Sequence, residues 1–358
     1  MPGLREVRDA LLHAHAEHLI NDEEFLLLYD LNKSKNPDYA YWNYERFDID
    51  RFNDDECIAE FRFLKNDIHF LREKLEIPEV VTFSNRLKVT GVESLCILLN
   101  RFAYPSRLGD MVHMYGRPVP QLSMIVNEMT NSLYERYHHK LNTLNQAWLS
   151  PQRLEEFAQA VHQAGAPLTN CWGFVDGTVR PICRPGENQR IVFNGHHRVH
   201  AIKFQSIATP NGLVANLYGP VEGRRHDSGM LRDSEIYPQL EQFSRAMNGD
   251  LLCIYGDLAY PFRPHLQTPF KNARRTAEQN AYNTAMSKVR IGVEWVFGDI
   301  VNFYKFLDFK KNLKLGLQPI GKMYIVCTFL MNIRTCMYGS MTSNYFNIDP
   351  PTVDEYLE

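Results

Sequence analysis

The hydrophobic period of this 358-residue chain changes near Pro167. Between residues 54 and 145, apolar side chains recur at three- and four-residue spacing, which predicts helices. Later, residues 171–176 and 251–255 are short apolar runs and residues 201–208 alternate, which predicts strands. The change indicates a domain boundary within residues 150–168.

One turn and two helices complete the second half of the predicted fold. Residues 209–212 read Thr-Pro-Asn-Gly, a turn that would join strand 201–208 to a hairpin partner at 213–218. A long helix is predicted at about 277–303 and an apolar one at about 320–337. This order fits an α/β fold in which helices flank a mixed sheet, with antiparallel strands first and parallel strands after them.

The remaining segments define the predicted domain organisation. Residues 1–55 are expected to form an N-terminal helix, over residues 1–30, and an arm. Residues 56–165 would form an all-helical domain, in which two helices around Gly116–Pro120 resemble a helix-turn-helix. Two packed helices without any DNA contact are the alternative. Residues 166–338 would form the mixed-sheet domain, and residues 339–358 a flexible tail.

Charge is unevenly distributed along the chain. The formal net charge is −3, yet residues 21–80 carry 16 acidic and 8 basic side chains, and residues 260–322 carry 11 basic and 4 acidic ones. The second segment could attract a polyanion, or both segments could be solvated surfaces. No run of 18 apolar residues is present, which predicts no membrane span. The seven cysteines form no CxxC pair, so they are expected to be reduced intracellular thiols.

Three carboxylates occupy positions that would allow them to meet. Asp176 follows the first predicted strand, Asp257 follows the fourth, and Glu294 lies on the long helix. Strand ends on one side of an open sheet are where ligand sites cluster. Taken singly, the residues could instead be a turn residue, a helix cap and a solvated surface side chain.

Converging carboxylates would repel one another without a cation. Together they would form a hard oxygen site suited to Mg²⁺ or Mn²⁺, with two ions expected. Such a site suits metal-dependent cleavage of phosphodiester bonds, and a DNA 3′-hydroxyl could replace water as the nucleophile.

Four motifs in order resemble the DDE transposases of the Harbinger (PIF-like) superfamily. They are Gly173–Thr178, Gly219–Ser228, Gly256–Pro261 and Val289–Gly298. The leading segment Glu56–Phe63 and the closing segment Phe329–Arg334 also resemble that family, so the likeness extends over roughly residues 55–335.

This resemblance implies an RNase H-like fold with Asp176, Asp257 and Glu294 as the metal-binding triad. It also implies a protein found in the nucleus and also in the cytoplasm, which acts as a homo-oligomer on DNA. A separate Myb/SANT-like partner would supply DNA recognition and nuclear import. Two departures predict a weaker grip on DNA. Asp299 stands where the family has a basic residue, and the run Asn194–His200 carries histidines where lysines are usual. These histidines could bind zinc, but we expect no zinc site here.

Basic residues around the triad are candidate DNA phosphate contacts, which would position DNA without specifying its sequence. They are Arg180, Arg198, Arg224, Arg225, Lys271, Arg274, Arg275, Lys288 and Arg290, together with Arg184 and Arg190.

Three hypotheses follow for the function. The first is an active transposase that cuts transposon ends and joins them to target DNA. The second is a domesticated protein of the same descent that serves as a DNA- or chromatin-associated module with reduced or no transposition activity. The third is a metal-dependent phosphatase acting on small phosphates, against which the extended basic segment 260–322 argues.

Overall fold

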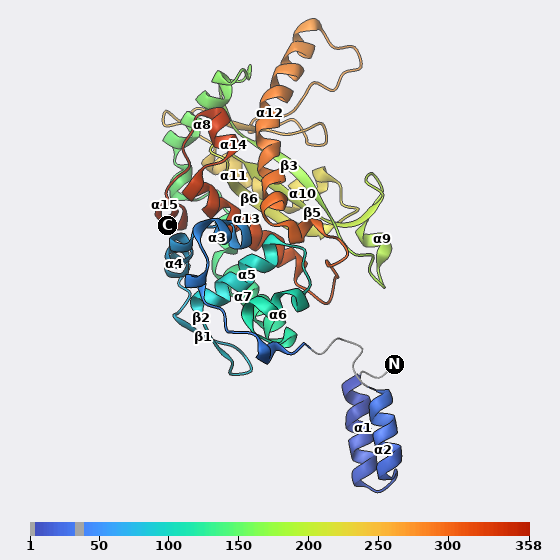
Figure 1. The fold of residues 1–358 in the computed structure, drawn as a ribbon. Coiled ribbons are helices and arrows are strands. Elements are labelled where there is room, and N and C mark those ends of the chain that lie inside the picture. Colours follow the sequence, from blue (N-terminus) through green and yellow to red (C-terminus); the bar gives the residue numbers. More distant parts are fainter. Residues whose placement is uncertain (1–3, 33–38) are drawn as a thin grey trace.

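The computed structural model describes residues 4–32 and 39–358 (Figure 1). The N-terminal segment forms two helices, α1 (Leu4–Ala16) and α2 (Asp22–Leu31), which pack side by side. The single helix predicted over residues 1–30 is therefore wrong. Asn21 starts a new helix by accepting a hydrogen bond from the backbone of Glu24, whose side chain accepts one from Asn21 in return. Residues 1–3, and residues 33–38 of the predicted arm, lie outside the described residues.

The helix predicted to start at Asp54 is also two helices, α3 (Asp54–Phe61) and α4 (Lys65–Lys74). Asn53 caps α3, and Arg62 ends it in the left-handed region at φ 72°. Phe61 and Leu71 are buried in the core, whereas Ile58 is 41% exposed. The three- and four-residue spacing of the apolar side chains continues from α3 into α4, because the second helix begins only three residues after Arg62.

The domain predicted to be all-helical contains a small antiparallel sheet. Strands β1 (Val80–Thr82) and β2 (Lys88–Thr90) pair with Val81 opposite Val89. Helix α5 (Gly91–Ala103) begins directly after β2, where the Thr90 hydroxyl accepts a hydrogen bond from the Glu93 backbone. The hairpin is too short for its alternation to stand out in the sequence.

The structure does not confirm the helix-turn-helix. The first predicted helix is a 3₁₀ turn, η3 (Leu108–Met111), followed by a single helical turn, α6 (Val112–Tyr115). The second, α7 (Val119–Tyr137), directs its apolar side chains into the core and packs against α5. Leu122, Ile125 and Leu133 are almost fully buried.

The sheet has the predicted mixed topology. In the described chain it contains six strands in the order β4-β5-β3-β7-β8, with β6 also paired to β5. The β3–β5, β4–β5 and β5–β6 pairs are antiparallel, and the β3–β7 and β7–β8 pairs are parallel. The strands are β3 (Cys171–Pro181), β4 (Phe193–Asn194), β5 (Val199–Ala208), β6 (Val214–Glu222), β7 (Cys253–Tyr255) and β8 (Leu266–Gln267).

Strand β3 runs further than its apolar segment predicts. Asp176 was expected at its end, but the strand continues to Pro181 because residues 174–181 all pair with β5. The parallel partner β7 is shorter and stops at Tyr255, opposite Phe174. Asp176 therefore lies within β3, just beyond the point at which β7 ends.

Two long helices connect the sheet to the rest of the molecule. Helix α12 (Ala277–Phe303) packs against β3, and its bounds agree with the predicted helix. Helix α13 (Ile320–Tyr338) contacts both α7 and β6, and so lies between the helices around α7 and the large sheet (Figure 1). Its side chains are buried on nearly every side.

The C-terminal tail is folded, contrary to the predicted flexible segment. Residues 341–346 form α14 (Met341–Phe346) and residues 353–357 form α15 (Val353–Leu357). Tyr356 is 1% exposed, and its hydroxyl accepts a hydrogen bond of 2.9 Å from Asn332. Two aromatic rings, those of Trp148 and Phe329, lie beside it and anchor the tail.

The remaining elements are short, apart from the 13-residue α8. They are η1 (Tyr41–Asn43), η2 (Ile49–Arg51), η4 (His138–Leu141), η5 (Ala147–Leu149), α8 (Pro151–Gln163), α9 (Gln189–Val192), α10 (Asp227–Asp233), α11 (Ile236–Phe243) and η6 (Lys305–Asp308). All seven cysteines are free thiols, five of them buried. Within the described ranges, no helix has the length and apolarity needed to cross a membrane.

Candidate active site

A cavity of about 550 Å³ lies beside β3, at the level where β7 ends. Its wall is mainly polar and includes two of the three predicted carboxylates, Asp176 and Asp257. The other charged side chains in the wall are Lys203, Arg224, Arg225 and Asp227. The segments 176–179, 194–197 and 223–227, distant in sequence, meet here.

The parallel pairing of β3 and β7 brings Asp176 and Asp257 together. Phe174 of β3 is opposite Tyr255 of β7. Asp176 comes two residues after Phe174, and Asp257 comes two residues after Tyr255. Asp176 Oδ1 accepts a hydrogen bond of 2.8 Å from the Gly177 backbone. Asp257 Oδ1 accepts one of 2.9 Å from the Ala259 backbone, which fixes the turn after β7.

Glu294 reaches the site through Arg290, one turn earlier on α12. The Arg290 guanidinium lies 3.2 Å from Asp176 Oδ2 and 2.6 Å from Glu294 Oε1. Arg290 was a candidate DNA contact, but in this structure it bridges two members of the predicted triad. Within residues 4–32 and 39–358, no three His, Cys, Asp or Glu side chains are close enough together to hold a metal ion.

The pKa of Asp176 responds to both of the other carboxylates, Asp257 and Glu294. Burial raises the pKa of Asp176 to about 6, although Arg290 and the Gly177 hydrogen bond act to lower it. The negative charges of Asp257 and Glu294 raise this pKa further. The cluster therefore holds more negative charge than Arg290 alone compensates.

A fourth carboxylate, Asp227, faces the same cavity. Its Oδ1 accepts a charged hydrogen bond of 2.5 Å from Lys203, whose side chain is only 7% exposed. A Cβ added to Gly177 would lie 2.7 Å from Asp227 Oδ1, so the glycine permits this close approach. The sequence carried one signal for the pair, because Lys203 is a charged residue within an otherwise largely apolar strand. In the sequence, Asp227 stands out only as part of the Gly219–Ser228 motif.

Tyr260 packs beneath the carboxylates. It is fully buried, and its hydroxyl has no hydrogen-bond partner among the described residues. Burial raises the pKa of Tyr260, and Asp227, Asp176 and Asp257 raise it further, so its phenol faces this acidic cluster. The ring lies against Gly256, where an added Cβ would be 2.8 Å from the tyrosine Cδ2. Tyr260 belongs to the Gly256–Pro261 motif, but the sequence assigned it no role at the site.

The structure divides the candidate DNA contacts. Arg224 and Arg225 line the cavity, and Arg225 also pairs with Asp233. The Arg180 guanidinium lies over the Tyr324 ring and donates to the Thr178 hydroxyl, which turns it toward the protein. The others lie on the surface outside the cavity wall: Arg184, Arg190, Arg198, Lys271, Arg274, Arg275 and Lys288.

Histidines form part of the cavity wall. His196 and His197 sit in the turn between β4 and β5, and His226 precedes α10. Asn194 organises this turn, because its side chain accepts from the His197 backbone and donates to the Gly223 carbonyl. The histidines therefore flank the carboxylates on a turn tied to the next segment of the wall.

Comparison with known proteins identifies the sheet region. Residues 175–332 match the family described as DDE superfamily endonuclease. A curated relative, "Protein ALP1-like" of Arabidopsis thaliana, is 21% identical over 267 residues, which are 72% of this chain. The match spans 63% of that relative's length. No solved structure matches.

Proposed function

Because residues 175–332 carry the DDE superfamily endonuclease domain, we propose that this protein cuts DNA phosphodiester bonds at the ends of a transposable element. It then joins the freed 3′-hydroxyl to target DNA. The domain and the relative are consistent with a Harbinger-type DDE nuclease.

The observation that carries this proposal is the shared register of Asp176 and Asp257. Adjacent parallel strands hold the two aspartates on one cavity wall, and Arg290 ties Glu294 of α12 to Asp176. Two carboxylates from neighbouring strands and one from a covering helix suit an RNase H-like nuclease site.

The donor atoms are of the kind that a divalent cation, Mg²⁺ or Mn²⁺, prefers, although the described carboxylates would have to move closer together to hold one ion. All three residues offer carboxylate oxygens, the donors that these hard cations prefer. Burial is the main reason that the pKa of Asp176 is raised, and the negative charges of Asp257 and Glu294 add to it; a bound cation would offset these charges. When bound, one or two such ions would supply Lewis-acid activation of the attacking hydroxyl and charge stabilisation at the leaving oxygen.

The chain's own groups would position the DNA. Arg224 is exposed at the cavity wall and would bind a backbone phosphate next to the scissile bond. Lys203 holds Asp227 in place, so its positive charge partly offsets the acidic wall that an incoming phosphate must approach. Arg290 would move from Glu294 toward the DNA phosphate once the carboxylates have another cation.

Partners and location follow as parts of the proposal. The acidic segment 21–80, which would repel DNA, supports dependence on a separate Myb/SANT-like protein for DNA recognition and entry into the nucleus. Cutting two transposon ends together would require a homo-oligomer on DNA.

One observation favours a second function. Arg290 contacts both Asp176 and Glu294 and offsets part of their negative charge, an arrangement that a chain without nuclease activity could also use. A domesticated descendant that binds DNA or chromatin as an interaction module would retain this arrangement.

A nicking assay on supercoiled plasmid bearing terminal inverted repeats tests the proposal. With Mg²⁺ or Mn²⁺, with and without a Myb-like partner, the wild-type chain should nick the plasmid, and Asp176→Asn, Asp257→Asn and Glu294→Gln should not. The matched control Asp55→Asn removes an exposed carboxylate far from the cavity in sequence and should retain activity. Cleavage that survives all three site substitutions would falsify the assignment. Specific binding of the repeats without nicking would favour the second function.

A further inference from the structure

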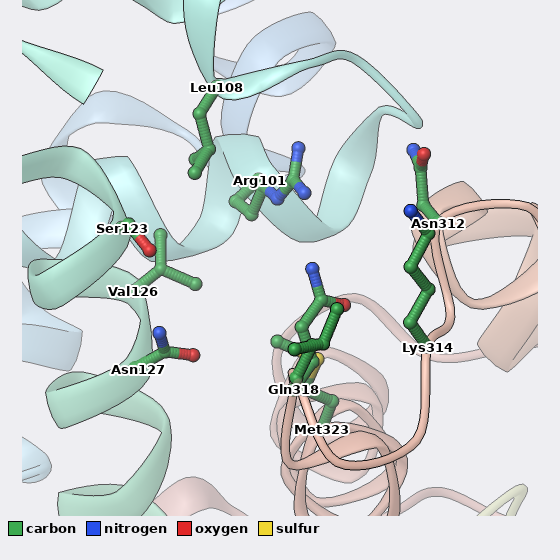
Figure 2. A pocket seen from close by; sticks show the side chains of 10 residues that line it. Arg101, Leu108, Ser123, Val126, Asn127, Asn312, Lys314, Gln318 and Met323 are labelled. Atoms are coloured by element: carbon green, nitrogen blue, oxygen red, sulfur yellow. The ribbon is translucent and has the colours of Figure 1, made fainter. Parts of the chain in front are cut away.

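A second cavity, of about 260 Å³, lies where helices α5 and α7 meet the loop between α12 and α13 (Figure 2). Helices α5 and α7 form one side and residues 312–318 the other. Its polar wall contains two cations, three carboxamides and one hydroxyl, from Arg101, Lys314, Asn127, Asn312, Gln318 and Ser123. No Asp or Glu is part of the described wall.

Arg101 is the unusual member of this wall. The residue is only 5% exposed, yet no ion pair involving it occurs in the described part of the chain. Its guanidinium donates to the Ser106 carbonyl and lies 4.2 Å from the centre of the Phe306 ring. Burial lowers the pKa of Arg101 to about 10, with only Asp110 acting in the opposite direction. Burying a guanidinium without a carboxylate is costly, because the carbonyl and the ring compensate only part of the lost hydration.

The neighbours of Arg101 leave further hydrogen-bonding capacity open. Gln318 Oε1 is buried and has no partner among the described residues, and turning the amide over would direct its NH₂ group to the same place. Figure 2 shows Arg101, Asn127 and Gln318 arranged around one open space. Lys314 stands at its edge on the loop and adds a second positive charge.

We propose that this cavity is a binding site for a phosphate group. A tetrahedral oxyanion accepts several hydrogen bonds at once, and the arginine fork pairs well with two phosphate oxygens. Amides and a hydroxyl from α7 and the loop would serve the remaining oxygens. The cavity is smaller than the sites that enclose drug-sized ligands, which fits one phosphate with little attached to it.

Two sources could deliver that phosphate. One is the backbone of DNA that extends from the cleavage site, and the other is a free phosphate or small phosphate ester. The loop that carries Lys314 follows α12, the helix of Glu294, and the intervening η6 packs against both α12 and α5, so occupancy of the cavity would hold this loop against α5. The inference concerns phosphate binding and does not require that the protein cut DNA.

Thermal unfolding of the full chain with inorganic phosphate or pyrophosphate is the first test. Lys314→Gln removes a cation from the cavity, whereas Lys311→Gln removes one three residues away that does not line it. Gln318→Glu places a carboxylate next to Arg101. We expect phosphate to raise the melting temperature of the wild type and Lys311→Gln. Gln318→Glu should melt higher than the wild type without phosphate and gain nothing from it, and Lys314→Gln should need about tenfold more phosphate.

The second test distinguishes the sources. Binding of a DNA duplex is measured as a function of salt concentration for the same variants. If DNA supplies the phosphate, the salt dependence of the Lys314→Gln variant should fall by about one unit of slope relative to Lys311→Gln. If a free phosphate ester is the ligand, the slopes should agree and only the thermal shift should respond. The proposal is overturned if neither the thermal shift nor the slope separates Lys314→Gln from Lys311→Gln.

Discussion

Arg290 and Asp176 form an ion pair of 3.2 Å between helix α12 and strand β3. The same guanidinium lies 2.6 Å from Glu294. One cation therefore joins the helix to the sheet among the carboxylates that we propose as metal ligands. Under that proposal, Arg290 would compete with an incoming ion for Asp176 and Glu294.

Replacing Arg290 by Gln should expose this competition. Without the guanidinium the carboxylates repel, so the metal-free protein should lose about 1–2 kcal/mol of stability. Added Mn²⁺ should then stabilise the variant more than the wild type, because no internal cation competes. Differential scanning fluorimetry with and without Mn²⁺ measures both effects. Lys288→Gln, an exposed change on the same helix, is the control, and equal Mn²⁺ responses in the two variants would contradict the prediction.

The raised pKa of Asp176 predicts a pH-dependent gain from Asp176→Asn. Burial holds this pKa at about 6, above its ordinary value of 3.8. In the wild type, the contribution of Asp176 to the free energy of unfolding is therefore complete below pH 3.8, and it is lost as the pH rises through 6. Asparagine stays neutral, so the metal-free variant should gain about 2 kcal/mol over the wild type between pH 4 and pH 7, at about 1.36 kcal/mol per unit. Urea unfolding across this range tests it, and a constant difference would refute the assignment.

The Lys203–Asp227 pair should behave as a buried ion pair. Lys203 is 7% exposed and Asp227 is 25% exposed at the side chain. Asp227→Asn leaves a buried ammonium without its carboxylate, so we expect a loss of about 3 kcal/mol. The exposed Arg225–Asp233 pair provides the comparison, because Asp233→Asn should cost less than about 1 kcal/mol. Chemical denaturation of both variants decides, and equal losses would mean that burial does not strengthen the first pair.

Gly256→Ala tests the packing under the carboxylates. The new methyl group would lie 2.8 Å from the Tyr260 ring and 2.9 Å from Val175 Cγ1. We expect a loss of about 1–3 kcal/mol from overpacking, together with lower nicking activity because Asp257 follows directly. Gly249→Ala alone would not be a fair control, because that glycine has a φ of +89°. Gly186→Ala, which meets nothing within 4 Å, is the better one and should leave stability nearly unchanged.

The folded tail predicts that Tyr356→Ala destabilises the whole domain. Its ring is 1% exposed and its hydroxyl is bonded to Asn332, so truncation should cost about 3–5 kcal/mol. Tyr345→Ala removes a tyrosine that is 42% exposed and should cost much less. A tail that tolerated both changes equally would be flexible in solution, as the sequence had suggested.

Long periodic segments were the predictable part of this molecule. The 27 residues of α12 have the predicted bounds, since many apolar positions agree on one period. Four of the six strands of the large sheet, β3, β5, β6 and β7, followed from apolar or alternating runs and a Thr-Pro-Asn-Gly turn, whose Gly212 adopts a φ of +82°. The order of the strands within the sheet was not predicted. The short strands β1 and β2 were not predicted, because three residues are too few to show an alternation of apolar and polar side chains.

The triad assignment stays a prediction; the structure brings Asp176 and Asp257 to one cavity wall, and no sequence pattern predicted the contacts made there. Asp176, Asp257 and Glu294 could be selected by their places after apolar runs and on a helix. That Arg290 would bridge Asp176 and Glu294 depends on the orientation of α12 over the sheet, which no local pattern encodes. Lys203 and Tyr260 entered the site through strand pairing and burial, both of which are tertiary facts.

The shared register of β3 and β7 has a consequence for how the length of such a chain can vary. The distance between Asp176 and Asp257 is set by backbone pairing at Phe174 and Tyr255, whatever the chain does between the strands. Insertions or deletions in the loop around Asn248 should therefore be tolerated. One residue gained or lost between Tyr255 and Asp257 would rotate the second carboxylate away from the first. Within about a dozen residues, insertions or deletions near Asn248 should leave the site intact, whereas those between Tyr255 and Asp257 should disrupt it.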